Sequence, residues 1–284
     1  VRDVLRRLKP RKAPGLDGWS VAELRLLPDE LLDLVAELFE AVEGGAPWPD
    51  ELCAPEGLLL PKGGADEAAD PLSRRPIWLL PMLYRVWAAG RAHTMASWVA
   101  SWAGDAHGLG AEDLAWELAL ELEGAEAAGE AICGAALDWR KAFDHVLLDH
   151  LAPSLQRAGV PDWIVRPLLR AYGAPRRLRV SGALGKEWAP SSGILPGCAL
   201  AVFVLAVLVR PWERRTGRIH DLLRRRIYVD DLTLWAPGPI AVVAQPVAEA
   251  LAETRRFEHA MQWQLNLLKS RQFANTTALR EALH

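Results

Sequence analysis

The sequence predicts an α+β fold, because helical and strand-like segments are mixed without a regular alternation of strand and helix. Two observations support this prediction. Apolar residues at helical spacing dominate the first half of the chain, as in residues 29–42. The second half contains short runs of β-branched, aromatic and small apolar residues, such as residues 131–138 and 226–235.

The composition limits the classes of protein to which the chain can belong. The chain has 284 residues, of which 51% are hydrophobic and 24% charged, which is ordinary for a soluble globular protein of one large or two small domains. The net charge of −3 is not basic, so any nucleic-acid surface has to be local. Three widely spaced cysteines (Cys53, Cys133, Cys198) favour a reducing, intracellular compartment, nucleus or cytoplasm. The longest apolar run, 194–209, is too short to span a bilayer, so no membrane contact is expected.

The elements follow from periodicity and from capping signals. Ser20 and Glu23 match the capping-box pattern at the start of a helix. Residues 131–138 are predicted to be a fully buried strand because the run is short and continuously apolar. The other predicted elements are helices at 29–42, 82–102, 112–128, 145–158 and 162–172, a hairpin turning at 182–185, an apolar helix after Gly197, a hairpin at 226–235 and a helix at 242–263.

The hairpin RIYVDDLTLW (226–235) places Asp230 and Asp231 at the turn between two apolar strands. Neighbouring carboxylates repel each other, and burying an unpaired charge is costly. A divalent cation would neutralise the pair, and Mg²⁺ prefers carboxylate oxygens that share its coordination shell with substrate phosphates. The sequence therefore indicates a metal site at this turn.

A third carboxylate, Asp138, ends the predicted strand 131–138. Taken alone, Asp138 would be interpreted as a cap of the next helix, as Asp144 is. Combined with a distant Asp-Asp hairpin, Asp138 becomes a candidate ligand of the same site. Two metal ions held in this way can activate an attacking hydroxyl and stabilise a leaving pyrophosphate.

ALDWRKAFDHV (136–146) and YVDD (228–231) together resemble the two metal-binding motifs of reverse transcriptases, and KAFD is most similar to the non-LTR (LINE-type) retrotransposon branch. The resemblance covers about residues 11–273. Further blocks stand in the order of that branch: RKAPGLDGWS from Arg11, LLLPK ending at Lys62, RRPIWLLPMLYRVWA from Arg74, SSGILPGCALA from Ser191 and LNLLKS from Leu265.

The resemblance implies a right-hand polymerase with fingers and palm, and with the thumb largely missing. It implies fingers and fingers–palm connections at about 1–128 and 150–190, and a palm core at about 129–149 and 191–275. The implied activity is RNA-directed DNA polymerisation, in which a nucleotide passes from a dNTP to a primer 3′-hydroxyl. The implied partners are an RNA template, a DNA primer and two Mg²⁺ ions, with Mn²⁺ as an alternative.

By the same resemblance, Asp138, Asp230 and Asp231 are the metal-binding and catalytic carboxylates, with Asp231 acting mainly through electrostatics. Lys269 matches a lysine near the leaving pyrophosphate, where it is a candidate proton donor.

Five further residues match substrate-binding positions. Lys62 and Arg75 match the fingers residues that bind the incoming triphosphate, for which permanently charged groups are suited. Phe143 matches an aromatic gate against the ribose 2′-hydroxyl, with ordinary core packing as an equal alternative. Gly193 and Gly197 flank a loop whose backbone approaches the nascent base pair.

The sequence departs from the family at Pro196, where glutamine is usual. This departure leaves a second hypothesis open, in which the chain is a decayed retroelement copy that folds and binds nucleic acid without catalysis. A polymerase that prefers ribonucleotides is disfavoured by Phe143. Several basic residues beside the motif blocks are candidates for phosphate contacts: Arg6, Arg7, Lys9, Arg11, Lys12, Arg176, Arg177, Arg179 and Arg224 to Arg226.

Overall fold

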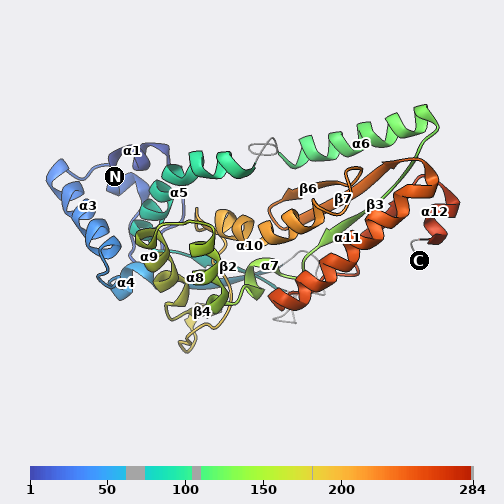
Figure 1. The fold of residues 1–284 in the computed structure, drawn as a ribbon. Helices are drawn as coiled ribbons and strands as arrows, with labels where there is room; N and C mark the ends of the chain where they lie inside the picture. The colour runs from blue at the N-terminus through green and yellow to red at the C-terminus, as the bar shows by residue number, and fades with distance from the viewer. Residues whose placement is uncertain (62–73, 104–109, 181, 283–284) are drawn as a thin grey trace. The chain divides into compact units, whose positions relative to one another are not determined.

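The structure is a computed structural model that describes residues 1–61, 74–103, 110–180 and 182–282 (Figure 1). Helices and strands are mixed, as the sequence predicts, and the chain divides into two compact units. Helices α5 (Met82–Ala103) and α10 (Ala201–Thr216) each continue from one unit into the other. Unit 1 comprises Val1–Ser97 and Val146–Val204, and unit 2 comprises Trp98–His145 and Leu205–His284.

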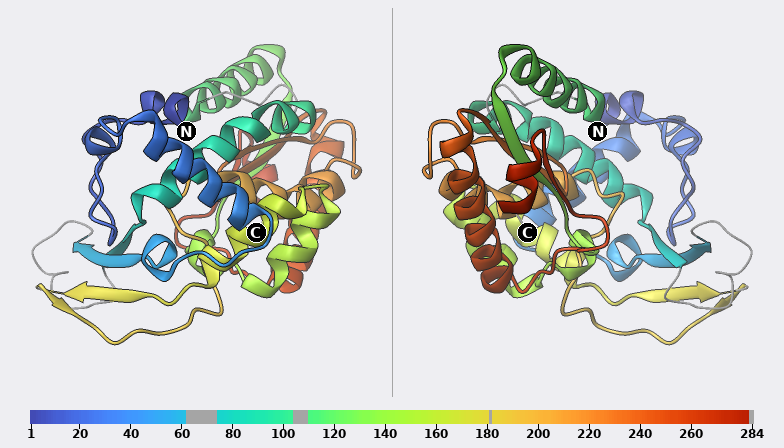
Figure 2. Two further views of the ribbon diagram at one scale, coloured as in Figure 1. Left: turned by 90° about the vertical axis from the view of Figure 1, so that its left-hand side faces the viewer. Right: turned by 90° about the vertical axis from the view of Figure 1, so that its right-hand side faces the viewer.

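Unit 1 contains a four-stranded sheet in the order β2-β1-β4-β5. Strand β1 pairs antiparallel with β2 and parallel with β4. Strands β4 and β5 form a hairpin as predicted, but its turn is wrongly placed by the sequence, because Val180 pairs with Ala183 and β5 lies within the predicted turn at 182–185. Figure 2 shows the yellow β4–β5 ribbon beside the blue β1 strand. Strands β1 and β2 are not predicted from the sequence, because their apolar runs lack the alternation typical of a half-buried strand. The strands are β1 (Glu56–Pro61), β2 (Arg74–Leu79), β4 (Arg177–Val180) and β5 (Ala183–Leu184).

The helices of unit 1 pack around a buried aromatic cluster. Trp48 makes edge-to-face contacts with Tyr84 and Trp87, with ring centroids 5.7 and 5.6 Å away. The Trp48 indole N–H donates a 3.0 Å hydrogen bond to the Pro167 carbonyl. The helices are α1 (Arg2–Arg7), α2 (Val21–Leu24, with the predicted capping box), α3 (Asp29–Glu43), α4 (Asp50–Cys53), α8 (Leu148–Arg157) and α9 (Asp162–Gly173).

Unit 2 contains an antiparallel sheet in the order β6-β7-β3-β8, with β3 at the predicted residues. Helix α11 packs on β3 and β7, where the Cys133 thiol donates a 3.4 Å hydrogen bond to the Val243 carbonyl. The elements are α6 (Ala111–Ala128), β3 (Ala131–Asp138), α7 (Ala142–His145), β6 (Arg224–Tyr228), β7 (Asp231–Gly238), α11 (Ile240–Met261), β8 (Arg271–Ala274) and α12 (Thr277–Ala282).

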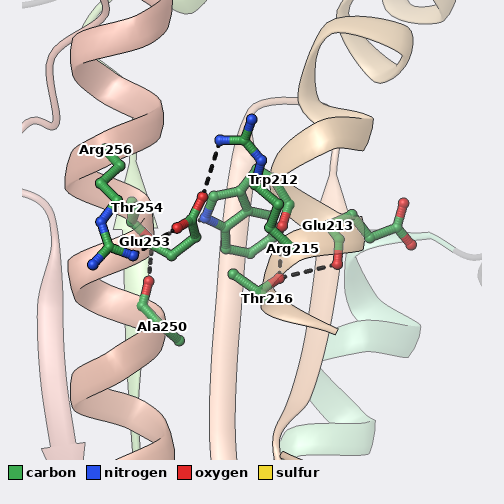
Figure 3. Close-up of polar contacts among 8 residues, drawn as sticks. All are labelled: Trp212, Glu213, Arg215, Thr216, Ala250, Glu253, Thr254 and Arg256. Atoms are coloured by element: carbon green, nitrogen blue, oxygen red, sulfur yellow. Dashed lines mark hydrogen bonds and ion pairs between the residues drawn. The ribbon is translucent and has the colours of Figure 1, made fainter. Parts of the chain in front are cut away.

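Polar contacts join α10 to α11 in unit 2 (Figure 3). The buried Glu253 carboxylate accepts hydrogen bonds from Arg215 at 3.1 Å and from Arg256 at 3.0 Å. Beside it, the Trp212 indole N–H donates a 2.9 Å hydrogen bond to the Thr254 hydroxyl, and both residues are fully buried. These contacts fix the helix that supports the sheet.

Two further predicted boundaries are wrong. The turn of the Asp-Asp hairpin is formed by Val229 and Asp230, because Tyr228 and Asp231 pair across β6 and β7. The helix predicted from residue 145 begins at Leu148, because Leu147 instead forms an antiparallel bridge with Ser192. None of the described helices is long and apolar enough to cross a membrane.

Candidate metal and nucleotide site

Asp138 and Asp231 stand directly opposite each other across the β3–β7 pair in unit 2. Directly opposed side chains in an antiparallel pair have Cβ atoms about 4.5–5.5 Å apart. Asp230 precedes Asp231 in the turn, so the structure brings all three predicted carboxylates to one end of the sheet. Successive side chains alternate between faces, so Asp138 and Asp231 lie on the face opposite Cys133 and α11.

The carboxylates form a local concentration of negative charge. Burial raises the pKa of Asp230, and the charge of Asp138 raises it further. Burial likewise raises the pKa of Asp231, with further contributions from Asp230 and Asp138. Lys269 opposes both shifts, and its Nζ lies 3.9 Å from Asp138 Oδ1. A bound cation would relieve the same repulsion.

The 264–270 loop fixes the end of the strand that carries Asp138. The Arg140 N–H donates to the Gln264 carbonyl and the Asn266 N–H to the Asp138 carbonyl, both at 2.8 Å. The Asp138 N–H donates in turn to the Ser270 hydroxyl at 3.1 Å. The sequence reasoning missed Ser270, although it lies next to Lys269 in the LNLLKS block.

An aromatic cluster packs next to Asp138, on the side of the sheet that carries α11. The Trp139 ring, beside Asp138 in the chain, lies 5.8 Å from Phe257 of α11 and 5.6 Å from Trp263. All three rings are buried, which holds the strand end against the helix.

The turn before Asp231 has a strained backbone. Val229 has φ +58°, a left-handed conformation that β-branched residues rarely adopt. Tyr228, which is 38% exposed, pairs with Asp231 across this turn. Strain of this kind costs about 1–3 kcal/mol and tends to occur at functional sites.

A magnesium site at these carboxylates stays a prediction, because they do not form a preformed cage. Among the described residues, no group of three or more His, Cys, Asp or Glu side chains is placed to hold a metal ion. Mg²⁺ commonly binds one or two carboxylates and completes its shell with water and substrate phosphates. Asp138, Asp230 and Asp231 supply that kind of incomplete carboxylate set.

The remaining predicted residues are divided between the units. Phe143 is half-buried in α7 of unit 2. Arg75 lies in β2 of unit 1, where its backbone pairs with Leu60. Gly193 and Gly197, also in unit 1, both have φ +96°, which favours glycine. Lys62 lies outside the described residues.

The departure at Pro196 has a local structural explanation. The Cys198 N–H donates a 3.1 Å hydrogen bond to the Leu195 carbonyl, which closes a four-residue turn. Proline at the second position and a positive-φ glycine, Gly197, at the third are typical of a type II turn. Pro196 therefore suits the backbone of this loop.

Three of the arginines considered for phosphate contact are engaged within the fold. Arg176 is only 5% exposed and donates a 3.0 Å hydrogen bond to the Tyr172 carbonyl, so its prediction as a phosphate contact is wrong. Arg179 forms an ion pair with Glu56. Arg226 forms one with Glu117 of α6.

Comparison with known proteins gives one curated relative and a set of similar folds. The chain is 28% identical over 241 residues to a 115 kDa protein of the type-1 retrotransposable element R1DM of Drosophila melanogaster. The match covers 82% of this chain and 22% of the relative, so the chain spans about a fifth of that protein. No protein-family model matches the chain.

Solved telomerase structures share the fold. Telomerase from Candida tropicalis, in complex with the TWJ fragment of telomeric RNA, matches with a TM-score of 0.60 at 8% identity. That match covers 87% of this chain and 45% of the telomerase chain. Apo telomerase from the same organism, truncated from its C-terminal domain, matches with a TM-score of 0.54 at 10% identity, over 82% of this chain and 52% of the other. The chain is therefore similar in sequence to a retrotransposon protein and shares the fold of the telomerase structures, which supports the reverse transcriptase domain that the ordered motifs predict.

Proposed function

We propose that the domain catalyses RNA-directed DNA synthesis, transferring a nucleotide from a dNTP to a primer 3′-hydroxyl on an RNA template. One observation supports this most strongly. Asp138, Asp230 and Asp231 come from two distant segments of the chain and share the end of one sheet with Lys269. A compact set of carboxylates with one adjacent lysine suits metal-assisted phosphoryl chemistry.

In this proposal the three aspartates would hold two Mg²⁺ ions, with Mn²⁺ as an alternative. The bound ions supply positive charge to the attacking and leaving oxygens. Residues of the chain itself donate the proton and position the carboxylates. Lys269 gives a proton to the leaving pyrophosphate. Asn266 and Ser270 hold Asp138 in place through the 264–270 loop.

Residues outside the carboxylate set bind and select the substrate. Lys62 and Arg75 bind the triphosphate, for which cationic side chains are suited. Phe143 excludes a ribose 2′-hydroxyl and thereby selects dNTPs. Gly193 and Gly197 let backbone approach the nascent base pair, a role consistent with their positive φ.

The proposal keeps the polymerase division into fingers and palm. Fingers and connections are assigned to about residues 1–128 and 150–190, and the palm core to about 129–149 and 191–275. The bound nucleic acids would be an RNA template and a DNA primer, and the site of action would be intracellular.

Primer extension on poly(rA)/oligo(dT) with Mg²⁺ tests the proposal. We expect Asp230→Asn to lower incorporation more than about 100-fold, as expected on losing a group that stabilises the transition state. The matched control is Asp221→Asn, which alters an exposed aspartate just before β6 and should leave incorporation unchanged. Incorporation that survives Asp230→Asn would reject the metal-site assignment.

The same assay separates the second candidate, a decayed copy that binds nucleic acid without turnover. Pro196 at the usual glutamine position is the observation that favours it. A wild-type domain that incorporates no nucleotide yet binds RNA with a steep salt dependence would support this candidate.

A further inference from the structure

Helix α6 carries apolar side chains on two opposite faces. The inner face packs on the sheet of unit 2, where Ala125 belongs to a buried cluster with Ile132 of β3 and Trp235 of β7. Leu118 and Leu122 are half-buried against the same cluster. Their spacing of three to four residues is that of one helix face. This face accounts for the attachment of α6 to the sheet.

The outer face carries a second apolar pair. Trp116 and Leu120, one turn apart, are 68% and 63% exposed. At 100° per residue, Trp116 points about 160° away from Leu118 and about 180° away from Ala125. Figure 1 shows α6 lying along the β6–β7 side of the sheet, with none of the described elements of unit 2 on its outer side. Nothing in the described part of unit 2 therefore explains a tryptophan here.

Acidic residues surround this pair. Glu112, Asp113 and Glu123 are exposed and lie within about 60° of Trp116 around the helix. The sequence contains no lysine or arginine anywhere in residues 92–139. In the same stretch the acidic residues are Asp105, Glu112, Asp113, Glu117, Glu121, Glu123, Glu126, Glu130 and Asp138.

A shallow groove borders Leu120 on the side of α6 that lies next to Pro237 of β7, where the inner-face residue Ala125 also lines it. It has a volume of about 470 Å³ and is lined by Leu120, Gly124, Glu121, Glu130 and Pro237, among others. Arg226 neutralises Glu117 at one side of the groove, whereas Glu121 and Glu130 form no ion pair within the described part of the chain.

The charge decides which partner fits. Phosphates of nucleic acid and anionic lipid headgroups would both be repelled by this face. A basic protein segment would be attracted to it, and an exposed tryptophan with a leucine one turn later is the kind of anchor found in helix–groove recognition. We propose that the outer face of α6, with Trp116 and Leu120 as anchors, docks a basic amphipathic helix of a partner protein. This inference does not depend on the proposed catalysis.

Fluorescence anisotropy tests the proposal with a defined probe. The probe is a labelled 18-residue peptide of lysine and leucine whose leucines share one helix face, and the comparison peptide has the same composition with the leucines scattered. At about 0.15 M salt we expect a Kd of about 1–100 µM for the first peptide, typical of a transient interaction. The scattered peptide should bind at least tenfold more weakly.

Two sets of variants distinguish the contribution of the anchor side chains to peptide affinity from the contribution of the overall negative charge. Trp116→Ala with Leu120→Ala should weaken the first peptide at least tenfold, and Glu112→Gln with Glu123→Gln should weaken it and flatten its salt dependence. The matched control is Leu267→Ala with Leu268→Ala, which removes two leucines that are 79% and 84% exposed elsewhere in unit 2 and should change nothing.

Three results would overturn the proposal. Equal binding of the two peptides, or full affinity in the Trp116/Leu120 double variant, would mean adsorption by charge alone. Sedimentation showing a dimer that this double variant dissociates would mean that a second copy covers the face. Because no step requires nucleotide incorporation, failure here leaves the polymerase proposal standing, and the converse also holds.

Discussion

The backbone N–H of Asp138 donates a 3.1 Å hydrogen bond to the hydroxyl of Ser270, which lies beyond α11 in the chain. Together with the Asn266 contact, this bond ties the end of β3 to the 264–270 loop. A side chain outside the carboxylate set thereby helps to position a proposed metal ligand.

Replacing Ser270 should therefore affect turnover more than substrate binding. In the proposed reaction, we expect Ser270→Ala to lower kcat about tenfold with KM near its wild-type value, because small displacements of reacting groups are costly. Ser270→Thr keeps the hydroxyl and should restore most of the rate. Steady-state primer extension measures both, with the exposed Gln272→Ala as control. Equal kcat in Ser270→Ala and wild type would remove Ser270 from this role.

Val229→Gly should stabilise the protein. Glycine adopts φ +58° without strain, which relieves about 1–3 kcal/mol, and its greater freedom in the unfolded chain costs about 0.5–1 kcal/mol. We expect a higher midpoint of urea unfolding at unchanged m-value. Val180→Gly, at a half-exposed position of strand β4, is the matched control and should lower the midpoint. A decrease in both variants would contradict the assignment of strain to Val229.

Thr254→Val should destabilise the contact between α10 and α11. The change keeps the shape of the side chain but removes the acceptor of the buried Trp212 N–H, 2.9 Å away. Leaving a buried donor unsatisfied costs about 1–3 kcal/mol. Urea unfolding measures this loss, and Thr94→Val, at an exposed threonine, should stay within about 0.5 kcal/mol of wild type. A loss at Thr254 no larger than at Thr94 would show that another group satisfies Trp212.

The thiols should be unreactive in the folded protein. Burial raises the pKa of Cys53 and of Cys133 to about 11, and burial also raises the pKa of Cys198. Only the thiolate reacts, so labelling by Ellman's reagent should be slow at pH 8 and should accelerate as the pH rises toward 11. Unfolding in urea should expose all three cysteines, since the denatured chain restores ordinary pKa values. Rapid release at pH 8 without urea would contradict this burial.

Local patterns predicted the regular elements well. The capping box at Ser20 and the helical spacing after Asp29 place two helices correctly, and the strand that ends at Asp138 has the predicted bounds. These signals come from residues close in sequence, where periodicity and capping act directly. Strand β8 carries no comparable signal, since it forms by pairing with β3.

The site was predicted in part. The meeting of Asp138 with Asp231 was expected from the family resemblance, whereas the turn at Val229 was not, because propensity disfavours a β-branched residue at positive φ. Arg176 was considered a candidate phosphate contact because a basic residue beside a motif block is usually exposed to solvent. Here its guanidinium lies 5.2 Å from the centre of the Trp78 ring, a contact that only the fold could reveal.

The Leu195–Cys198 turn bears on how this loop can evolve. Its second position requires only φ near −60°, which proline has built in and most other residues adopt freely. Exchanging Pro196 for glutamine would cost the backbone about 0.4–1 kcal/mol of lost rigidity and no rearrangement. The turn therefore accepts either side chain without rearrangement, so a substitution at this position can change the chemistry of the loop while its backbone stays the same.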